Sequence, residues 1–469
     1  MEYSRPIAIS SPKPYSLLGL DRFTKPVTSH SLAKNVLLTN TSWWACASRL
    51  AIGFGECGYY VSAVYPAQGH PLRKTSVIRQ SFPYGARNPI TSLKKAIRAS
   101  SPDLVIPCDD RAVEHLHLLY VEAAGSGERD LTDLIERSLG NPASFSIAQS
   151  RSAVIEIAAE SGVRVPATRQ LRSLSDLKGI QDRGSSWVLK SDGSWGGHGV
   201  RMVHSREQAE AAYRELSRAL PTARFVKRLL VDRDPYWLQT WLHRSRPAIV
   251  AQAFVKGRPA NMIASCWRGE LLDTISAEVV QAQGPTGSAT VVRIVDSPEM
   301  VLAARILARR LELSGFFGLD FMIEEETGSC YLIEMNPRST PLAHLALGMG
   351  RDPLAALAAR LSGAAPSARQ PVTQEDLIAY FPQAWHWDPN SEFLKISFCD
   401  VPSSEPELVK DLLQVPFPDR SLLARISHRL RREAFRDRRV RGGFFQAALM
   451  SRKKANEPPK GVPCRTTHP

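Results

Sequence analysis

In the first third of the chain, short apolar runs alternate with segments of helical spacing. The apolar runs predict three strands: Asn35–Thr39, Tyr59–Tyr65 and Asp103–Pro107. The segments of helical spacing predict two helices between them: Trp43–Ile52 and Leu93–Ala99. This alternation indicates an α/β parallel sheet whose ligands bind beyond the carboxyl ends of the strands. Asp109 and Asp110 follow the third strand, and we expect one of them either to bind an amine substrate or to cap the next helix.

Further along, the apolar pattern predicts more strands and several capped helices. The strands are Trp187–Lys190, Val200–His204, Ala248–Val255, Glu270–Val280 and the strand-like piece Leu377–Trp385. The helices are Ala153–Ser161, Arg206–Leu220, Ser297 to about Leu313, and Asp352–Gly363. Ser297 and Pro298 illustrate the signal, because Ser is a favoured helix cap and Pro suits the first helical turn.

The segment from Gly315 to Arg338 reads as a β-hairpin that carries acidic side chains. Phe316–Ile323 and Tyr331–Met335 are apolar and aromatic, and turn-forming residues lie between them. Folding the hairpin about Thr327 places Asp320 opposite Glu334, and Asn336 shares the face of Glu334. Such hard oxygen donors suit Mg²⁺ when substrate phosphates complete its shell. The alternative is a strand end with solvated acids.

A glycine-rich loop separates the strands at Trp187–Lys190 and Val200–His204. Its glycines are Gly193, Gly196, Gly197 and Gly199. They leave the backbone free to approach a ligand, and successive N–H groups in such a loop can bind an anion. We expect a flexible lid over phosphates with Lys190 at its base. The competing interpretation is a plain turn with a surface lysine.

Composition changes the picture only at the C-terminal end. The chain has 469 residues, of which 43% are hydrophobic and 23% charged, as in ordinary globular proteins. We expect no signal peptide and no membrane-spanning segment. The seven cysteines show no CxxC spacing, which favours a reducing, cytoplasmic setting over disulfides or zinc.

The basic charge is concentrated near the C-terminus. The segment from Arg420 to Lys460 supplies +10 of the net charge of +14. Ser421 to Val440 is expected to form a basic amphipathic helix that is solvated, and the alternative is that residues 420–454 contact a membrane surface or an acidic partner. Specific nucleic-acid binding is not expected, since no nucleic-acid module accompanies the charge.

Residues 35–363 together resemble the ATP-grasp superfamily of carboxylate–amine ligases. The resemblance rests on the order of three elements: Lys190 with its glycine loop, the strand Gln252–Val255 followed by Gly257, and Asp320…Glu334-x-Asn336-x-Arg338. It implies an N-terminal Rossmann-like parallel-sheet domain and a nucleotide-binding core of two α+β subdomains. The expected parts are an extension (1–33), a Rossmann-like domain (34–140), a lid subdomain (141–258), a central subdomain with the metal site (259–365), a satellite (366–418) and a basic tail (419–469).

The resemblance also implies roles for single residues. Lys190 would contact the ATP phosphates, and the backbone of Gln252, Ala253, Phe254 and Val255 would recognise adenine. Asp320, Glu334 and Asn336 would hold Mg²⁺, with Mn²⁺ as an alternative. Arg338 would stabilise the transferred phosphate or the tetrahedral intermediate.

The chain departs from the family pattern at two places. Arg151 stands where a second phosphate-binding lysine is usual, so the charge is kept but the geometry differs. The acid that binds ribose after the hinge glycine is missing, and Asn261 is the candidate replacement. Arg293 is expected to reach the γ-phosphate or to be a surface arginine, and His344 to contact substrate or to pack a helix.

The resemblance implies an ATP- and Mg²⁺-dependent ligase that joins a small carboxylate to an amine through an acylphosphate. Phosphorylation makes the carboxylate a better acyl donor, and a lid excludes water from the acylphosphate. The alternative is a non-catalytic or regulatory ATP-binding protein. The oligomeric state is left open, with a homodimer as one option.

Overall fold

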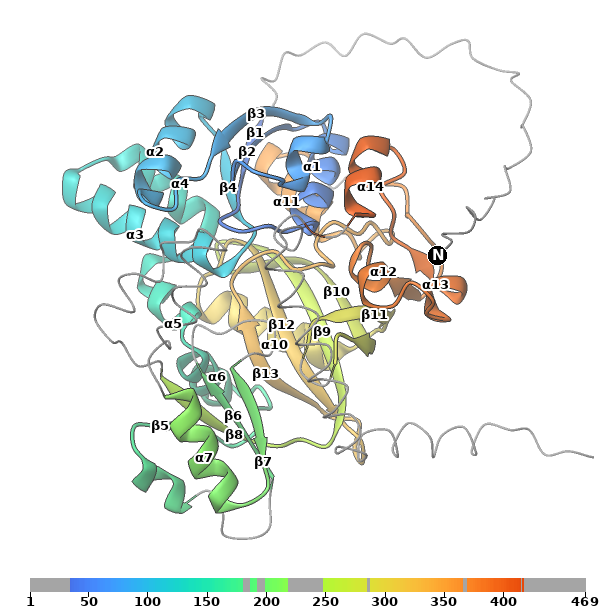
Figure 1. Ribbon diagram of the computed structural model, residues 1–469. Helices are drawn as coiled ribbons and strands as arrows, with labels where there is room; N and C mark the ends of the chain where they lie inside the picture. The colour runs from blue at the N-terminus through green and yellow to red at the C-terminus, as the bar shows by residue number, and fades with distance from the viewer. Residues whose placement is uncertain are drawn as a thin grey trace, which may run out of the picture. The chain divides into compact units, whose positions relative to one another are not determined.

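The computed structural model describes residues 34–179, 186–191, 199–217, 248–284, 287–365, 369–414 and 416. The expected N-terminal extension and basic tail lie outside these residues, as do Gly193, Gly196 and Gly197 of the predicted lid. The described chain contains a parallel sheet, a small antiparallel sheet and a large mixed sheet (Figure 1). The mixed α/β and α+β fold expected from the sequence is therefore confirmed.

The N-terminal sheet has the strand order β3-β2-β1-β4 and is parallel throughout. Its strands are β1 (Asn35–Thr39), β2 (Tyr60–Tyr65), β3 (Ile78–Pro83) and β4 (Leu104–Pro107). Its helices are α1 (Cys46–Glu56), α2 (Pro89–Ser100), α3 (Asp110–Ser126) and α4 (Arg129–Leu139). The sequence did not predict β3, because this edge strand is largely exposed and carries no apolar run.

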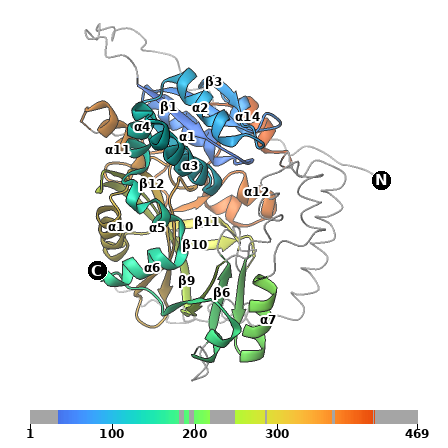
Figure 2. The same ribbon diagram turned by 90° about the vertical axis from the view of Figure 1, so that its left-hand side faces the viewer.

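The small sheet has the order β5-β8-β6-β7, and its neighbouring strands are antiparallel. The strands are β5 (Thr168–Leu171), β6 (Trp187–Ser191), β7 (Val200–Val203) and β8 (Ile249–Ala253). Helix α6 (Arg151–Glu160) precedes this sheet, and α7 (Arg206–Leu216) packs against β6 and β7 (Figure 2). The strands β6 and β8 bring the predicted phosphate lysine beside the predicted hinge.

The large sheet has the order β13-β12-β9-β10-β11-β14-β15. Its strands are β9 (Gly257–Trp267), β10 (Glu270–Ala282), β11 (Ala289–Ile294), β12 (Gly315–Glu324), β13 (Cys330–Asn336), β14 (Leu377–Ala379) and β15 (Phe398–Cys399). Helix α10 (Pro298–Arg310) buries its apolar side on one face, against Phe317 and Phe321. On the other face, α1 and α11 (Pro353–Ser362) share a core with Ile263. The acidic side chains of β12 and β13 lie outside both cores.

The remaining helices of the described residues are short. They are η1 (Pro71–Lys74), η2 (Pro142–Ser144), α5 (Phe145–Gln149), η3 (Leu174–Gly179), α12 (Gln383–Trp387), α13 (Phe393–Ile396) and α14 (Pro406–Leu412). The strand-like prediction for 377–385 is correct only at β14, because the chain turns at Pro382 and continues as α12. Within the described residues, no helix combines the length and apolar character needed to span a membrane.

Candidate active site

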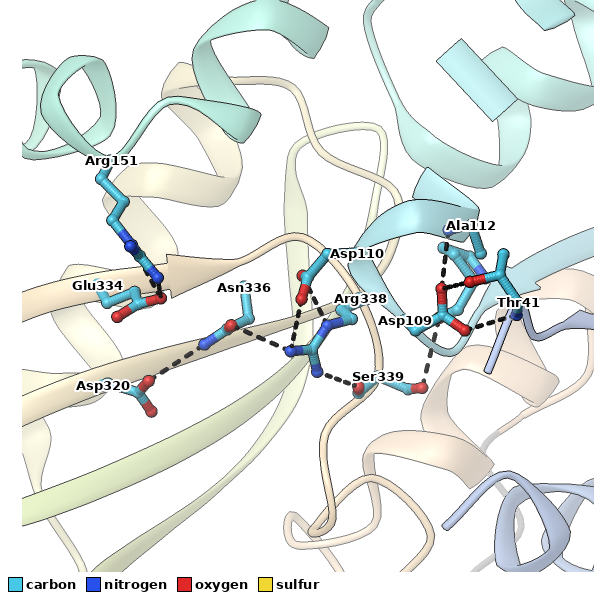
Figure 3. Close-up of polar contacts among 11 residues, drawn as sticks. Thr41, Asp109, Asp110, Ala112, Arg151, Asp320, Glu334, Asn336, Arg338 and Ser339 are labelled. Atoms are coloured by element: carbon cyan, nitrogen blue, oxygen red, sulfur yellow. Dashed lines mark hydrogen bonds and ion pairs between the residues drawn. The ribbon is translucent and has the colours of Figure 1, made fainter. Parts of the chain in front are cut away.

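The β12–β13 hairpin has the register predicted from the sequence. Asp320 pairs with Glu334, and a β-bulge follows between Asp320 and Phe321. Asn336 pairs with Gly318, two residues along β13 from Glu334. The hairpin therefore presents two carboxylates and an amide on adjacent strands (Figure 3).

Asp320 is held by two amides. Asn261 Nδ2 of β9 donates to Oδ1 at 2.5 Å, and Asn336 Nδ2 donates to Oδ2 at 3.1 Å. Burial and the neighbouring Glu334 raise the pKa of Asp320 to about 6. Asn261, the candidate replacement for the missing ribose acid, is thus directed at Asp320.

Glu334 is paired with Arg151, the first residue of α6. Arg151 Nε and Nη2 donate to Glu334 Oε1 at 3.2 and 2.9 Å, and Nη1 donates to the carbonyl of Ser191. Ser150 caps α6 by accepting a hydrogen bond from Ala153 N, which fixes the start of the helix at Arg151. One arginine therefore connects the end of β6 to the hairpin.

Lys190 is buried, with only 7% of its surface exposed. Its Nζ donates to Gln252 Oε1 at 2.9 Å and to the carbonyl of Ile333 at 3.2 Å. Burial lowers the pKa of Lys190, and Glu334 opposes this shift. The side chain of Gln252 therefore supports Lys190, and Gly199 O accepts from Ser191 N at the base of the predicted lid.

The predicted adenine segment borders a cavity of about 360 Å³. The lining residues come from the segment between α6 and β5, from the connection of β8 to β9, and from the hairpin tip: Val165, Pro166, Ala167, Ala253, Phe254, Val255, Lys256, Glu324, Glu326 and Tyr331. The backbones here are already paired in part, since Ala253 N donates to Ala167 O and Phe254 N to Ser186 O. This size lies within the usual range for a small-molecule site.

Arg338 follows the hairpin and connects it to the N-terminal domain. Its Nε and Nη2 donate to Asp110 Oδ1 and Oδ2 at 2.7 and 3.0 Å. Its Nη2 also contacts Asn336 Oδ1 at 3.4 Å, and its Nη1 donates to the carbonyl of Ser339 at 3.2 Å. Figure 3 shows this continuous polar chain from Asp110 to Asp320.

The three tentative substrate residues have protein partners. Asp109 caps α3 by accepting from Ala112 N at 2.9 Å, and it also accepts from Thr41 N and Oγ1. His344 is buried and contacts Asp400 at 2.5 Å through Nε2. Arg293 is half exposed and pairs with Asp376 at 3.5 Å. These contacts favour the cap, packing and surface alternatives, and substrate roles for the three stay predictions.

The donor set fits a magnesium ion that binds together with phosphates. In the described part of the chain, no group of three or more His, Cys, Asp and Glu side chains could hold a metal ion alone. Asp320 and Glu334 nevertheless lie close enough for Glu334 to raise the pKa of Asp320, so a cation bound at the two carboxylates would relieve their mutual repulsion. Mg²⁺ accepts one or two carboxylates when phosphates complete its shell.

A parallel sheet is thus followed by two further sheets, which bring a buried lysine beside an acidic hairpin. Residues 151–341 match the family model of the ATP-grasp domain, so this part of the chain is an ATP-grasp domain. No curated protein matches the chain by sequence at a significant level.

Solved structures share the fold at low sequence identity. One is an N5-carboxyaminoimidazole synthetase from Staphylococcus aureus complexed with ADP (13% identity, TM-score 0.50, 71% of this chain and 78% of that chain covered). Another is an L-amino acid ligase from Bacillus licheniformis (15%, 0.50, 72% and 78%). A third is the biotin carboxylase domain of a 2-oxoglutarate carboxylase from Hydrogenobacter thermophilus with MgADP and bicarbonate (14%, 0.52, 73% and 72%). At such identities the likeness concerns the fold.

The sequence did not predict the partners of two site residues. Asp110 was a candidate for binding an amine substrate or for capping the next helix, and its pairing with Arg338 spans 228 residues. Asn261 was considered for ribose, whereas β9 places it opposite Asp320. The strand pattern of β9 was the available signal for Asn261, since a continuous strand there would have paired with β12.

Proposed function

We propose that the protein is an ATP-dependent ligase that activates a small carboxylate as an acylphosphate and joins it to an amine, releasing ADP and phosphate. The observation that carries this proposal is the convergence of Asp320, Glu334 and Asn336 with Arg338 in an ATP-grasp domain. A protein that only binds a nucleotide has no need for an arginine joined to the metal-binding amide. ATP and Mg²⁺ are the expected cofactors, and the cytoplasm the expected compartment.

Each residue has a task that follows from its position. Lys190 and Arg151 are placed between the small sheet and the hairpin, where their charges would bind phosphate oxygens. Mg²⁺ bound at Asp320 and Glu334 would neutralise charge on the phosphates. Arg338 would stabilise the negative charge on the transferred phosphoryl group and on the tetrahedral oxyanion. The backbone of 253–255 would bind the base beside the cavity.

The test is ADP release by the purified chain with Mg-ATP and pooled amino acids, small carboxylates and amines. We expect release that requires a carboxylate–amine pair, and Glu334→Gln should lower it by about a hundredfold or more because a metal ligand is lost. Glu325→Gln is the matched control, since this glutamate lies in the same hairpin but pairs with exposed Lys256. Nucleotide binding without turnover in any pool would instead favour a regulatory ATP-binding protein.

A further inference from the structure

Asp110 binds the guanidinium of Arg338 in the way that the carboxylate of a free ligand would. It is the first residue of α3, and Asp109 fixes the start of that helix by capping it. Its two oxygens accept from Arg338 Nε and Nη2 at 2.7 and 3.0 Å. This two-point contact is the preferred geometry between a guanidinium and a carboxylate.

The hydrogen bonds of Arg338 leave little room for a second anion. The guanidinium has five N–H groups, and contacts with Asp110, Asn336 and Ser339 engage four of them. A substrate carboxylate that uses the Nε–Nη2 edge must therefore displace Asp110.

The exposure of the two partners shows which of them can move. The side chain of Asp110 is 48% exposed, whereas that of Arg338 is 16% exposed. Water hydrates the exposed Asp110 carboxylate when the pair opens, and Arg338 keeps its contacts with Asn336 and Ser339, so opening costs less than it would for a fully buried pair. Asp110 can turn away while Arg338 stays beside Asn336.

Charge balance then selects the substrate. A simple carboxylate on Arg338 would leave two anions beside one cation and would deprive Asp110 of its partner. A molecule with both charges replaces each half of the ion pair, because its carboxylate binds Arg338 and its ammonium binds Asp110. We propose that this opened pair recognises the zwitterion of an α-amino acid, an inference that rests on the proposed ligase function.

The experiment measures binding, so it does not depend on turnover. The chain saturated with Mg-ADP is screened with the twenty L-amino acids by thermal shift, and the best ligand is titrated by calorimetry. Its N-acetyl and des-amino derivatives should bind at least about tenfold more weakly. Asp110→Asn should weaken the amino acid by about tenfold or more, yet bind the des-amino acid at least as well as the wild type does.

Glu122→Gln is the matched control, because it removes one charge from α3 at a residue paired with Lys94. It should leave every affinity unchanged. Equal binding of the amino acid and its des-amino derivative by the wild type would overturn the inference, as would an equal loss of both in Asp110→Asn or no binding of any amino acid. ADP release driven by other carboxylate–amine pairs would then still support the ligase.

Discussion

At the scale of single residues, two adjacent acids at the end of β4 perform different tasks. Asp109 is half-buried and accepts hydrogen bonds from Thr41 and Ala112, whereas Asp110 faces the hairpin arginine. The first acid fixes the helix, and the second can then be presented to Arg338 in a defined place. This division suggests that changes at Asp109 act through stability and changes at Asp110 through ligand affinity.

Asp109→Ala should lower the free energy of unfolding by about 1–3 kcal/mol, because it removes a helix cap and leaves buried donors unpaired. Urea denaturation followed by circular dichroism measures the effect. Asp130→Ala, at an exposed position in the first turn of α4, is the comparison and should change stability by less than about 0.5 kcal/mol. If Asp109→Ala lost substrate binding without a loss of stability, the result would support a substrate role for Asp109 instead of the cap role.

The sequence predicts contacts between neighbouring strands of a hairpin, but it does not predict contacts between distant parts of the chain. The pairing of Asp320 with Glu334 follows from strand periodicity, because side-chain positions two apart share a face. The pairings of Arg338 with Asp110 and of Arg151 with Glu334 join residues 228 and 183 positions apart, and no local pattern encodes such contacts. Long-range partners depend on how the sheets pack, which periodicity does not contain.

At the scale of elements, the start of β9 approaches β12 so closely that only glycine fits. A Cβ at Gly257 would lie 2.0 Å from the carbonyl oxygen of Ile323 and 3.0 Å from the Cα of Glu324. The hinge therefore enters the large sheet without a side chain between it and the hairpin tip. This close approach also shapes the cavity lined by Lys256 and Glu324.

Gly257→Ala should weaken Mg-ADP binding and lower stability by about 1–3 kcal/mol, since the backbones of β9 and β12 must separate. Calorimetry and urea denaturation measure the two effects. Gly125→Ala is the control, because its Cβ meets nothing within 4 Å in the helix α3. That change should be neutral or stabilising by up to about 1 kcal/mol, and an equal effect of both changes would contradict the close-approach argument.

Strands and helices with a regular apolar pattern were easier to predict than exposed edge strands and short helices. The apolar strands β1, β2 and β4 and the capped helix α10 follow from their patterns. The strand β3 does not, because an exposed edge strand needs no apolar face. The helix α12 was mistaken for a strand because its aromatic residues favour strands intrinsically, and the backbone turn at Pro382 decided otherwise.

At the scale of the whole molecule, one buried and one half-buried histidine, His70 and His117, make the free energy of unfolding depend on pH. Burial lowers the pKa of His70 to about 3 and that of His117 to about 4. Both are neutral in the folded chain, whereas an unfolded histidine titrates near 6.5. Above about pH 6.5 both histidines are neutral in the folded and unfolded states, so they do not reduce the free energy of unfolding. As the pH drops toward 4 the unfolded state binds more protons, and the free energy of unfolding falls.

The wild type should lose more free energy of unfolding between pH 7.5 and pH 5 than His70→Asn does, by about 2 kcal/mol. Asparagine keeps an acceptor for Leu72 N. Urea midpoints of the variant and the wild type at the two pH values give the difference. His204→Gln, at an exposed position, should leave the difference unchanged. Identical pH slopes for His70→Asn and the wild type would contradict the buried neutral state.

The large sheet has a consequence for where this chain can be cut or exchanged. The match to the ATP-grasp domain ends at residue 341, but the sheet continues into β14 and β15, and Asp400 beyond it pairs with Arg49 of α1 and with His344. A fragment that stops at the domain boundary would expose the edge of β11 and leave a buried arginine without its acid. Recombination between such genes would therefore have to transfer α1, β14 and β15 together with residues 151–341, although sequence comparison draws the border earlier.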